Sequence, residues 1–174
     1  FLQLYRRLLD RGLTPLVVKG LVCRNLYREP DYRASGDEDV LIPAEQFRDC
    51  GRVFEENGLM PAEPQKDPEE EGEVPYFLPG GALHIELHKE LFPSESQAYG
   101  KLNDYFKEVF QRKIREEIHG VGIYTMCHTD HLLYLILHAF KHFLHSGFGV
   151  RQVFDALLGR EVELHPRALV VLVI

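Results

Sequence analysis

The apolar residues of the chain follow helical spacing in some stretches and alternate with polar residues in others. Apolar positions three and four residues apart are typical of amphipathic helices, whereas alternation over about four to eight residues is typical of strands. Helical spacing predicts helices over residues 1–11, 21–29, 44–57, 101–119, 128–146 and 150–160. Alternation and short β-branched runs predict strands over residues 16–18, 39–43, 76–79, 82–88 and 122–126.

The order of these elements, αβαβα followed by a hairpin and then helices, indicates the α+β class. We therefore predict a small mixed β-sheet with flanking helices over residues 1–100, and a helical region over residues 101–174 that packs on it. Residues 61–75 hold four prolines, six acidic residues and one lysine, and this composition predicts a surface loop. The chain begins at Phe1 and ends in the apolar stretch "ALVVLVI", so we expect both ends to continue in a longer protein.

Charge and cysteine content narrow the classes of function. The formal net charge of −7 argues against a nucleic acid as partner, because binding a phosphate backbone requires a basic face. The three cysteines are an odd set without metal-binding spacing, which predicts reduced thiols in a cytoplasmic protein. The sequence has no apolar run of about 18 residues, so we expect no helix that spans a membrane.

Three acidic residues, Asp37, Glu38 and Asp39, stand directly before an apolar run. In an extended chain the two aspartates point to the same side and repel each other, and a divalent cation such as Mg²⁺ removes that repulsion. A third carboxylate would complete a site for two metal ions, and Glu86 is the candidate because its strand has an apolar opposite face. Acid pairs are common in loops, however, and the pair by itself favours a strand cap on a solvated turn.

A turn that suits phosphate binding precedes the acid pair. The sequence "VVKG" ends a predicted strand at Lys19 and Gly20, and a predicted helix follows at once. Glycine lets a phosphate approach the backbone, the helix N-terminus offers free N–H groups, and the lysine adds positive charge. By itself this is a simple strand-to-helix turn. Together with Arg33, the acid pair and Glu86, it provides separate parts of one phosphoryl-transfer site.

Three stretches carry a resemblance to a known family. The stretch "VVKGLVCRNLYREPDYRASGDEDVLI" has a Lys-Gly turn, a Leu-Tyr helix, an arginine and an Asp-x-Asp strand, and "HIELHKELF" has an acidic residue followed by Leu-His. A third stretch, "LHAFKHFLHSGFGVRQVFDALL", has two histidines one helical turn apart before an Arg-x-x-x-Asp helix. Over most of residues 15–158 the chain therefore resembles the uncharacterised nucleotidyltransferase-like proteins of the polymerase-β-type nucleotidyltransferase superfamily.

The resemblance implies both a fold and a reaction. The fold would be the nucleotidyltransferase-like mixed sheet with flanking helices, and the reaction would transfer a nucleoside monophosphate from an NTP to an acceptor hydroxyl on a small molecule or a protein. Asp37 and Asp39 would bind two Mg²⁺ ions, or Mn²⁺ in their place, and Glu86 would bind one metal and help to deprotonate the acceptor. The residues that bind the nucleotide phosphates would be Lys19, Gly20 and Arg33.

The chain departs from the family pattern at two positions. Leu21 follows Gly20 where the superfamily has a serine that contacts phosphate, and Glu38 stands between the aspartates where it has an apolar residue. A charged group in the core costs a few kcal/mol unless it is paired, so we expect either an exposed strand edge at Glu38 or an arginine beside it. A catalytically silent nucleotide-binding or partner-binding protein on the same fold is the alternative function.

Histidines gather on the predicted helix that follows the fifth strand. His138 and His142 lie four residues apart on one face, a spacing that can bind Zn²⁺, and with Asp155 they make a metallohydrolase a further alternative. Helical histidine pairs usually lack a third and fourth ligand, which favours a core helix whose polar face borders the nucleotide or acceptor pocket. We expect His88 to orient a carboxylate of the site, and Asp155 to pair with a histidine or with Arg151.

Overall fold

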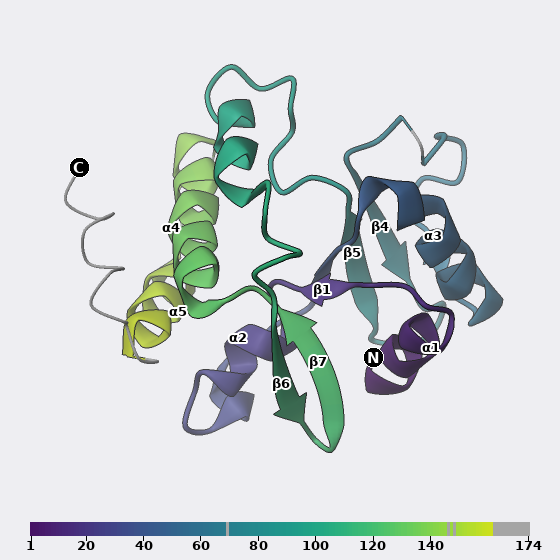
Figure 1. Ribbon diagram of the computed structural model, residues 1–174, viewed down its shortest axis with the longest axis horizontal. Coiled ribbons are helices and arrows are strands. Elements are labelled where there is room, and N and C mark those ends of the chain that lie inside the picture. Colours follow the sequence, from purple (N-terminus) through teal and green to yellow (C-terminus); the bar gives the residue numbers. More distant parts are fainter. Residues whose placement is uncertain (69, 146, 148, 162–174) are drawn as a thin grey trace.

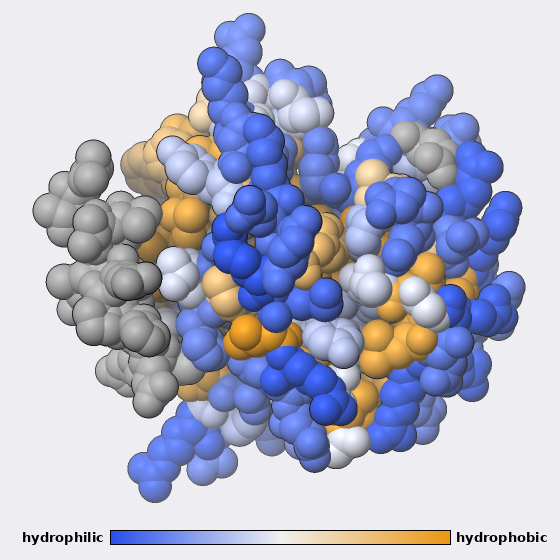
Figure 2. Space-filling view, viewed as in Figure 1, coloured by the Kyte–Doolittle hydropathy of each residue, from blue (hydrophilic) through white to orange (hydrophobic). Residues whose placement is uncertain are grey.

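The computed structural model describes residues 1–161 apart from residues 69, 146 and 148, so the end of the predicted helical region, residues 162–174, lies outside the described residues. The elements follow in the order α1 (Leu2–Asp10), β1 (Leu16–Val17), α2 (Leu21–Asn25), η1 (Pro30–Tyr32), β2 (Glu38–Leu41), η2 (Ala44–Gln46), α3 (Phe47–Glu56), β3 (Met60–Pro61), β4 (Glu73–Phe77), β5 (His84–His88), η3 (Gly100–Phe106), β6 (Ile114–Ile118), β7 (Val121–Thr125), α4 (His128–His145) and α5 (Val150–Glu161). Figure 1 shows α1 and α3 beside the sheet in one half of the molecule, and α4 and α5 in the other half. In the view of Figure 2 the surface is mostly hydrophilic, and apolar residues reach it in small patches.

Five short strands form one mixed sheet in the order β1-β2-β5-β4-β3. Within the described chain, β2 and β5 are the parallel pair of this sheet, with Asp39 opposite Glu86, and its other neighbouring strands are antiparallel. Strands β4 and β5 form the hairpin that the sequence predicts around Gly80, whose φ of 71° suits a turn. The predicted α+β class and mixed sheet are confirmed.

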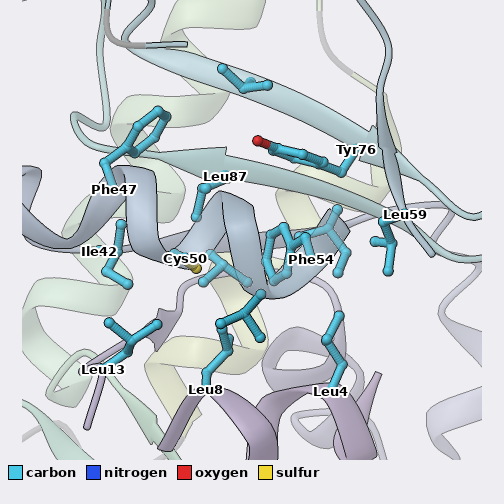
Figure 3. Packing of buried hydrophobic residues seen from close by; sticks show 14 residues of the cluster. Leu4, Leu8, Leu13, Ile42, Phe47, Cys50, Phe54, Leu59, Tyr76 and Leu87 are labelled. Carbon is cyan, nitrogen blue, oxygen red and sulfur yellow. The ribbon is translucent and has the colours of Figure 1, made fainter. Parts of the chain in front are cut away.

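The first hydrophobic core lies between one face of this sheet and helices α1 and α3 (Figure 3). Ile85 and Leu87 both reach this core from β5, because alternate residues of a strand point the same way. Phe54 of α3 is fully buried there, and its ring meets Tyr76 edge to face with centroids 5.2 Å apart. Burial of this face leaves Glu86, which alternates with the apolar residues of β5, on the opposite side of the sheet.

The predicted helix over residues 101–119 is wrong. The structure has the short 3₁₀ helix η3 and then β6, which pairs with β7 in a two-stranded hairpin. The hairpin turns at His119 and Gly120, with φ of 50° and 71°, and positive φ at both central residues is typical of a tight two-residue turn. Ile118 and Ile123 are buried in a cluster with residues of α1 and β1, so packing of one strand face outweighs the helical spacing of this stretch.

The two C-terminal helices of the prediction are confirmed as α4 and α5, which pack against each other. Tyr134 and Leu135 of α4 join Phe92 and Phe106 in a second buried cluster. The division into residues 1–100 and residues beyond stays a prediction. Among the described helices, none combines the length and the apolar character that crossing a bilayer requires.

Replacing Phe54 by alanine tests the first core. The side chain is fully buried, so we expect Phe54→Ala to lower the free energy of unfolding by about 3–5 kcal/mol. The matched change Tyr32→Ala, at a residue that is 82% exposed, should alter it by less than about 0.5 kcal/mol. Urea unfolding followed by circular dichroism measures both values, and equal losses in the two variants would contradict this placement of the core.

Candidate functional site

A pocket of about 230 Å³ opens between the sheet and helices α4 and α5. Most of the side chains that the sequence predicts for the site line this pocket: Lys19, Arg33, Asp37, Glu86, His88, His138, His142 and Asp155. Asp39 is buried behind them in contact with Lys19, and Gly20 continues the chain directly after that lysine. The structure therefore brings together residues that lie far apart in the sequence.

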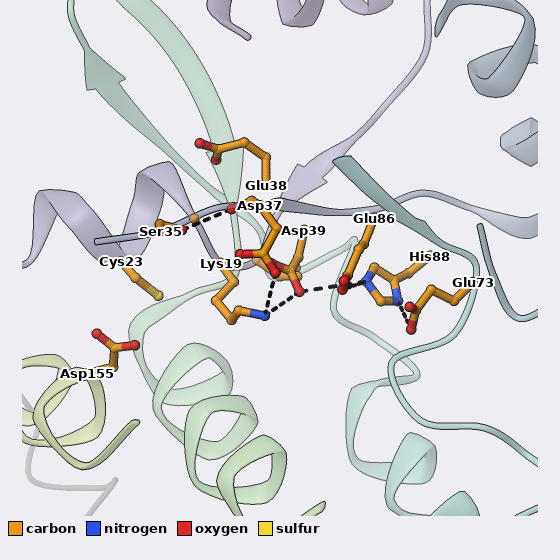
Figure 4. A network of polar contacts seen from close by, with 12 residues as sticks. Lys19, Cys23, Ser35, Asp37, Glu38, Asp39, Glu73, Glu86, His88 and Asp155 are labelled. Carbon is orange, nitrogen blue, oxygen red and sulfur yellow. Dashed lines mark hydrogen bonds and ion pairs between the residues drawn. The ribbon is translucent and has the colours of Figure 1, made fainter. Parts of the chain in front are cut away.

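The three predicted acidic ligands meet because β2 and β5 run parallel. Asp39 lies opposite Glu86 in the register, and Asp37 lies two residues before Asp39, so the three side chains leave the same face of the sheet. Figure 4 shows their carboxylates in a row with the ammonium group of Lys19 beside them, while Glu38 points the other way. Such a row concentrates negative charge, which other groups have to offset.

Lys19 supplies the first compensating charge. Its ammonium nitrogen lies 2.6 Å from Asp39 Oδ1 and 3.9 Å from Asp37 Oδ2 (Figure 4). Burial would lower the pKa of Lys19, but the negative charges of Asp39, Asp37 and Glu86 raise it above its usual value. Burial likewise opposes ionisation of Asp39, yet His88 and Lys19 hold the pKa of that carboxyl below its usual value. Both partners of the Lys19–Asp39 pair are therefore charged at neutral pH.

His88, at the end of β5, supplies the second compensating charge. Its Nε2 lies 3.8 Å from Asp39 Oδ1 and 3.7 Å from Glu86 Oε2, and its Nδ1 lies 3.4 Å from Glu73 Oε2. Burial would lower the pKa of His88, but these carboxylates raise it to about 9. Sequence reasoning missed Glu73, because it belongs to the acidic stretch that predicts a loop. The place of Glu73 in the site becomes visible in the pairing of β4 with β5, which sets Glu73 opposite His88.

The acidic row has the chemistry of a cation site. Asp39, Glu86 and His88 each offer one ligand atom, and these atoms lie within 4.8 Å of one another. Asp39 Oδ2 is buried and has no hydrogen-bond partner within the described part of the chain. A buried acceptor without a donor is costly, and a cation beside it would remove that cost. The carboxylate oxygens are hard ligands, which suit Mg²⁺ better than they suit softer metals.

Glu38 is buried and turns away from the pocket. Its carboxylate accepts a hydrogen bond from the Leu21 N–H at 2.6 Å and forms an ion pair with Arg24, which is the expected arginine partner. Gly20 has a φ of 67°, and a Cβ at this position would collide with Glu38 Oε2, so the turn requires glycine. The first N–H group of α2 is thus committed to Glu38.

Arg33 and Asp155 form a buried ion pair that joins α5 to the glycine turn. Arg33 Nε and Nη2 donate to the two carboxylate oxygens at 2.8 Å each, and the side chains are 1% and 4% exposed. Tyr27 also donates to Asp155, and Arg33 Nη1 donates to the carbonyl oxygen of Gly20 at 3.4 Å. The expected pairing of Asp155 with Arg151 or a histidine is wrong, because the guanidinium of Arg33 matches the carboxylate at two points.

His138 and His142 pack against each other on the pocket wall, with ring centroids 4.6 Å apart. Burial lowers the pKa of His138 to about 3 and also lowers the pKa of His142, so both imidazoles are neutral at neutral pH. In the residues that the structure describes, neither ring belongs to a group of three metal-ligand side chains. The histidine pair therefore lends no support to a metallohydrolase.

Comparison with protein-family models agrees with the function class that the geometry of the site indicates. The family described as "Uncharacterised nucleotidyltransferase" matches residues 1–161. The chain belongs to this nucleotidyltransferase family. The match confirms the resemblance that the sequence motifs carry. A comparison with curated proteins finds no match.

Solved structures share the fold of this nucleotidyltransferase. A crystal structure of an antigenic nucleotidyltransferase-like protein from Paracoccidioides brasiliensis is 14% identical, with a TM-score of 0.62, over 99% of this chain and 84% of that chain. A crystal structure of ANT(2″)-Ia in complex with adenylyl-2″-tobramycin is 13% identical, with a TM-score of 0.65, over 96% and 89% of the two chains. A solution structure of the antibiotic-resistance factor ANT(2″)-Ia is 13% identical, with a TM-score of 0.63, over 98% and 88%. At these identities the likeness shows the fold.

The raised pKa of His88 predicts a pH dependence of stability. The pKa of histidine is about 6.5 in an unfolded chain, so the folded protein holds this proton more tightly. The stabilisation is complete below about pH 6.5 and is lost as the pH rises through about 9, which should lower the free energy of unfolding by about 3 kcal/mol. Urea titrations in a chelator at several pH values measure this loss. His88→Gln should abolish it, and a loss of equal size in that variant would contradict the assignment.

The Arg33–Asp155 pair predicts non-additive losses of stability. Arg33→Met leaves the buried carboxylate of Asp155 without a cationic partner and should lower the free energy of unfolding by about 3–5 kcal/mol, and Asp155→Leu should act similarly. The double variant should lose clearly less than the sum, because neither charge remains. Arg52→Met, which breaks the exposed Arg52–Asp49 pair, is the matched control and should cost less than about 1 kcal/mol. Additive losses at Arg33 and Asp155 would rule out a direct coupling.

Proposed function

We propose that this nucleotidyltransferase transfers a nucleoside monophosphate from an NTP to an acceptor hydroxyl in a metal-dependent reaction. The observation that carries the proposal is the convergence of Asp37, Asp39 and Glu86 on one face of the sheet, beside Lys19 and at a pocket. Acids that merely cap a strand on a solvated turn would remain exposed and separate. Here Asp39 is buried, and its register neighbour is the third carboxylate.

The ligands that we propose for the metal are Asp37, Asp39 and Glu86, with two Mg²⁺ ions expected and Mn²⁺ as the alternative. Bound there, the ions would offset the negative charge that develops on the transferred phosphoryl group. The ring of His88 lies 3.8 Å from Asp39 Oδ1 and 3.7 Å from Glu86 Oε2, so we propose that it orients these two carboxylates.

The side chains around the acidic row have separate tasks in the proposed reaction. Glu86 is 33% exposed at the pocket, so its carboxylate can accept the proton of an acceptor hydroxyl as a general base. Lys19 places positive charge where the phosphates would lie, and Gly20 lets the chain pass close to them. Arg33 is committed to Asp155 and the Gly20 carbonyl, so we propose that it positions this turn.

For the acceptor we propose a small molecule with a free hydroxyl group, with a protein as the alternative. The ANT(2″)-Ia structure contains adenylyl-2″-tobramycin, an antibiotic joined to an adenylyl group. Because the two chains share a fold at low identity, this is an analogy, and it makes ATP the first donor and an antibiotic-like molecule the first acceptor to test.

The alternative of a catalytically silent nucleotide-binding or partner-binding protein predicts that Glu38 fills the pocket or that the acids diverge. Glu38 lies on the opposite face, where it pairs with Arg24 and the Leu21 N–H. Asp39 and Glu86 offer ligand atoms within 4.8 Å of each other. These observations favour a catalytically active site over a catalytically silent one.

We also propose a cytoplasmic location. The three cysteines are free thiols, with Cys23 and Cys50 buried and Cys127 half-buried. Burial raises the pKa of Cys23 to about 12, so this thiol is unreactive. An odd set of unpaired, mostly buried thiols is typical of reducing compartments.

Transfer of label from an NTP tests the proposed reaction. The protein is incubated with each NTP labelled in its α-phosphate, with Mg²⁺ and a cell extract, and labelled acceptors are separated. The double variant Asp37→Asn, Asp39→Asn should label more than about a hundredfold less, because the charges that hold the metal are gone. A chelator should have the same effect on the wild-type protein.

Asp49→Asn removes an exposed carboxylate on α3 and is the matched control, with labelling expected at the wild-type level. Circular dichroism verifies that the double variant is folded. Wild-type labelling in a folded double variant would show that the transfer does not use this site.

A further inference from the structure

Four lysine and arginine side chains line the pocket in addition to His88, and the structure pairs two of these four with carboxylates. The ammonium of Lys19 lies 2.6 Å from Asp39 Oδ1, and the guanidinium of Arg33 meets both oxygens of Asp155. All four groups are buried, so each cation is largely neutralised inside the fold. These two pairs reduce the positive charge that Lys19 and Arg33 offer to a further anion.

Lys141 of α4 and Arg151 of α5 are the other two pocket cations. No carboxylate within the described part of the chain forms an ion pair with either of them. Arg151 donates through Nη1 to the carbonyl oxygen of Ala34 at 2.7 Å, which fixes one branch of its guanidinium. Both cations also lower the pKa of His142, after burial and the charge of Lys19, which lower it more.

The opposite wall of the pocket is acidic. Asp37, Glu73 and Glu86 line it from the sheet side, and the formal net charge of the whole chain is −7. Lys141 and Arg151 attract a phosphate chain from the helical side, because opposite charges a few ångströms apart interact strongly near a protein surface, and the metal ions proposed for the acidic wall would attract it from the sheet side. The pocket is therefore polarised, with its negative side on the sheet and its positive side on the helices.

The glycine turn offers less to a phosphate than its sequence indicates. The Leu21 N–H, the first of α2, donates to Glu38 on the far side of the strand. Helix α2 has five residues, so its dipole is small. Because the turn and the helix N-terminus offer little, binding of a phosphate chain in this pocket depends more on cationic side chains.

We propose that Lys141 and Arg151 bind the β- and γ-phosphates of the NTP. The inference rests on the proposed function, which requires an NTP in this pocket. Arg151 offers a planar fork and Lys141 a point charge, a combination suited to two neighbouring phosphate groups. The helical wall thereby selects a triphosphate over a monophosphate, and it would hold the β- and γ-phosphates from the side opposite the proposed metal ions.

Titration calorimetry with the α,β-methylene analogue of each NTP, and with the matching nucleoside monophosphate, tests this assignment in Mg²⁺ buffer. For the analogue that the wild-type protein binds most tightly, Lys141→Met and Arg151→Met should each weaken binding about tenfold, and the double variant about a hundredfold. Binding of the monophosphate should change less than about twofold. The salt dependence of analogue binding should become shallower in the double variant, because fewer charges meet the ligand.

Lys107→Met removes an exposed lysine outside the pocket and is the matched control, with unchanged affinity expected. Lys141→Arg keeps the charge and should retain most of the affinity, whereas Arg151→Lys keeps the charge without the planar fork and should retain only part of it. Wild-type affinity for the analogue in the folded double variant overturns the inference and leaves the proposed function standing. An equal loss for the monophosphate overturns it as well, because the two residues then do not act on the β- and γ-phosphates. If the wild-type protein binds no analogue, the proposed function and the inference both fail.

Discussion

Strands β2 and β5 lie parallel and adjacent in the sheet, and the site depends on their register. Val40 of β2 and Ile85 and Leu87 of β5 are buried in the core against α1 and α3. A slip of one residue would turn these side chains to the pocket and send the carboxylates of Asp39 and Glu86 into the core. The apolar burial that fixes the register therefore also fixes the distance between the acidic side chains.

Acidic groups that are buried between the sheet and the helices require compensating charges. Lys19 and His88 serve Asp39 and its neighbours, Arg24 serves Glu38, and Arg33 serves Asp155. Buried pairs of this kind contribute little net stability, but breaking one leaves a charge that the interior cannot solvate. Their effect is geometric: each pair holds one segment near the pocket in a single position.

Short-range patterns in the sequence predict most of the elements and the side that several of them present. The alternation around Glu86 and the spacing of Phe47, Cys50, Val53 and Phe54 correctly predict the faces of β5 and α3, since both depend only on near neighbours. The strand over residues 122–126 was predicted and is β7. Its partner β6 was missed because residues 101–119 also fit helical spacing, and the His119–Gly120 turn is a weak signal beside it.

Short-range patterns do not predict contacts between segments that lie far apart in the sequence. Arg33 and Asp155 are 122 residues apart, and nothing local distinguishes Arg151 from Arg33 as the partner of that aspartate. Glu73 likewise is one of six acids in a stretch without clear periodicity, and only the pairing of β4 with β5 shows that it lies opposite His88.

The two walls of the pocket shift the pKa of a histidine in opposite directions. Carboxylates on the sheet wall raise the pKa of His88 to about 9. On the helical wall, burial and then the charge of Lys19 lower the pKa of His138 to about 3. His88 is buried and His138 is half-buried. Burial lowers the pKa of both rings, so the opposite direction at His88 comes from the carboxylates of the sheet wall around it. Neither half of the chain alone would produce this polarity, and the Arg33–Asp155 pair is what holds α5 against the glycine turn so that the two walls face each other.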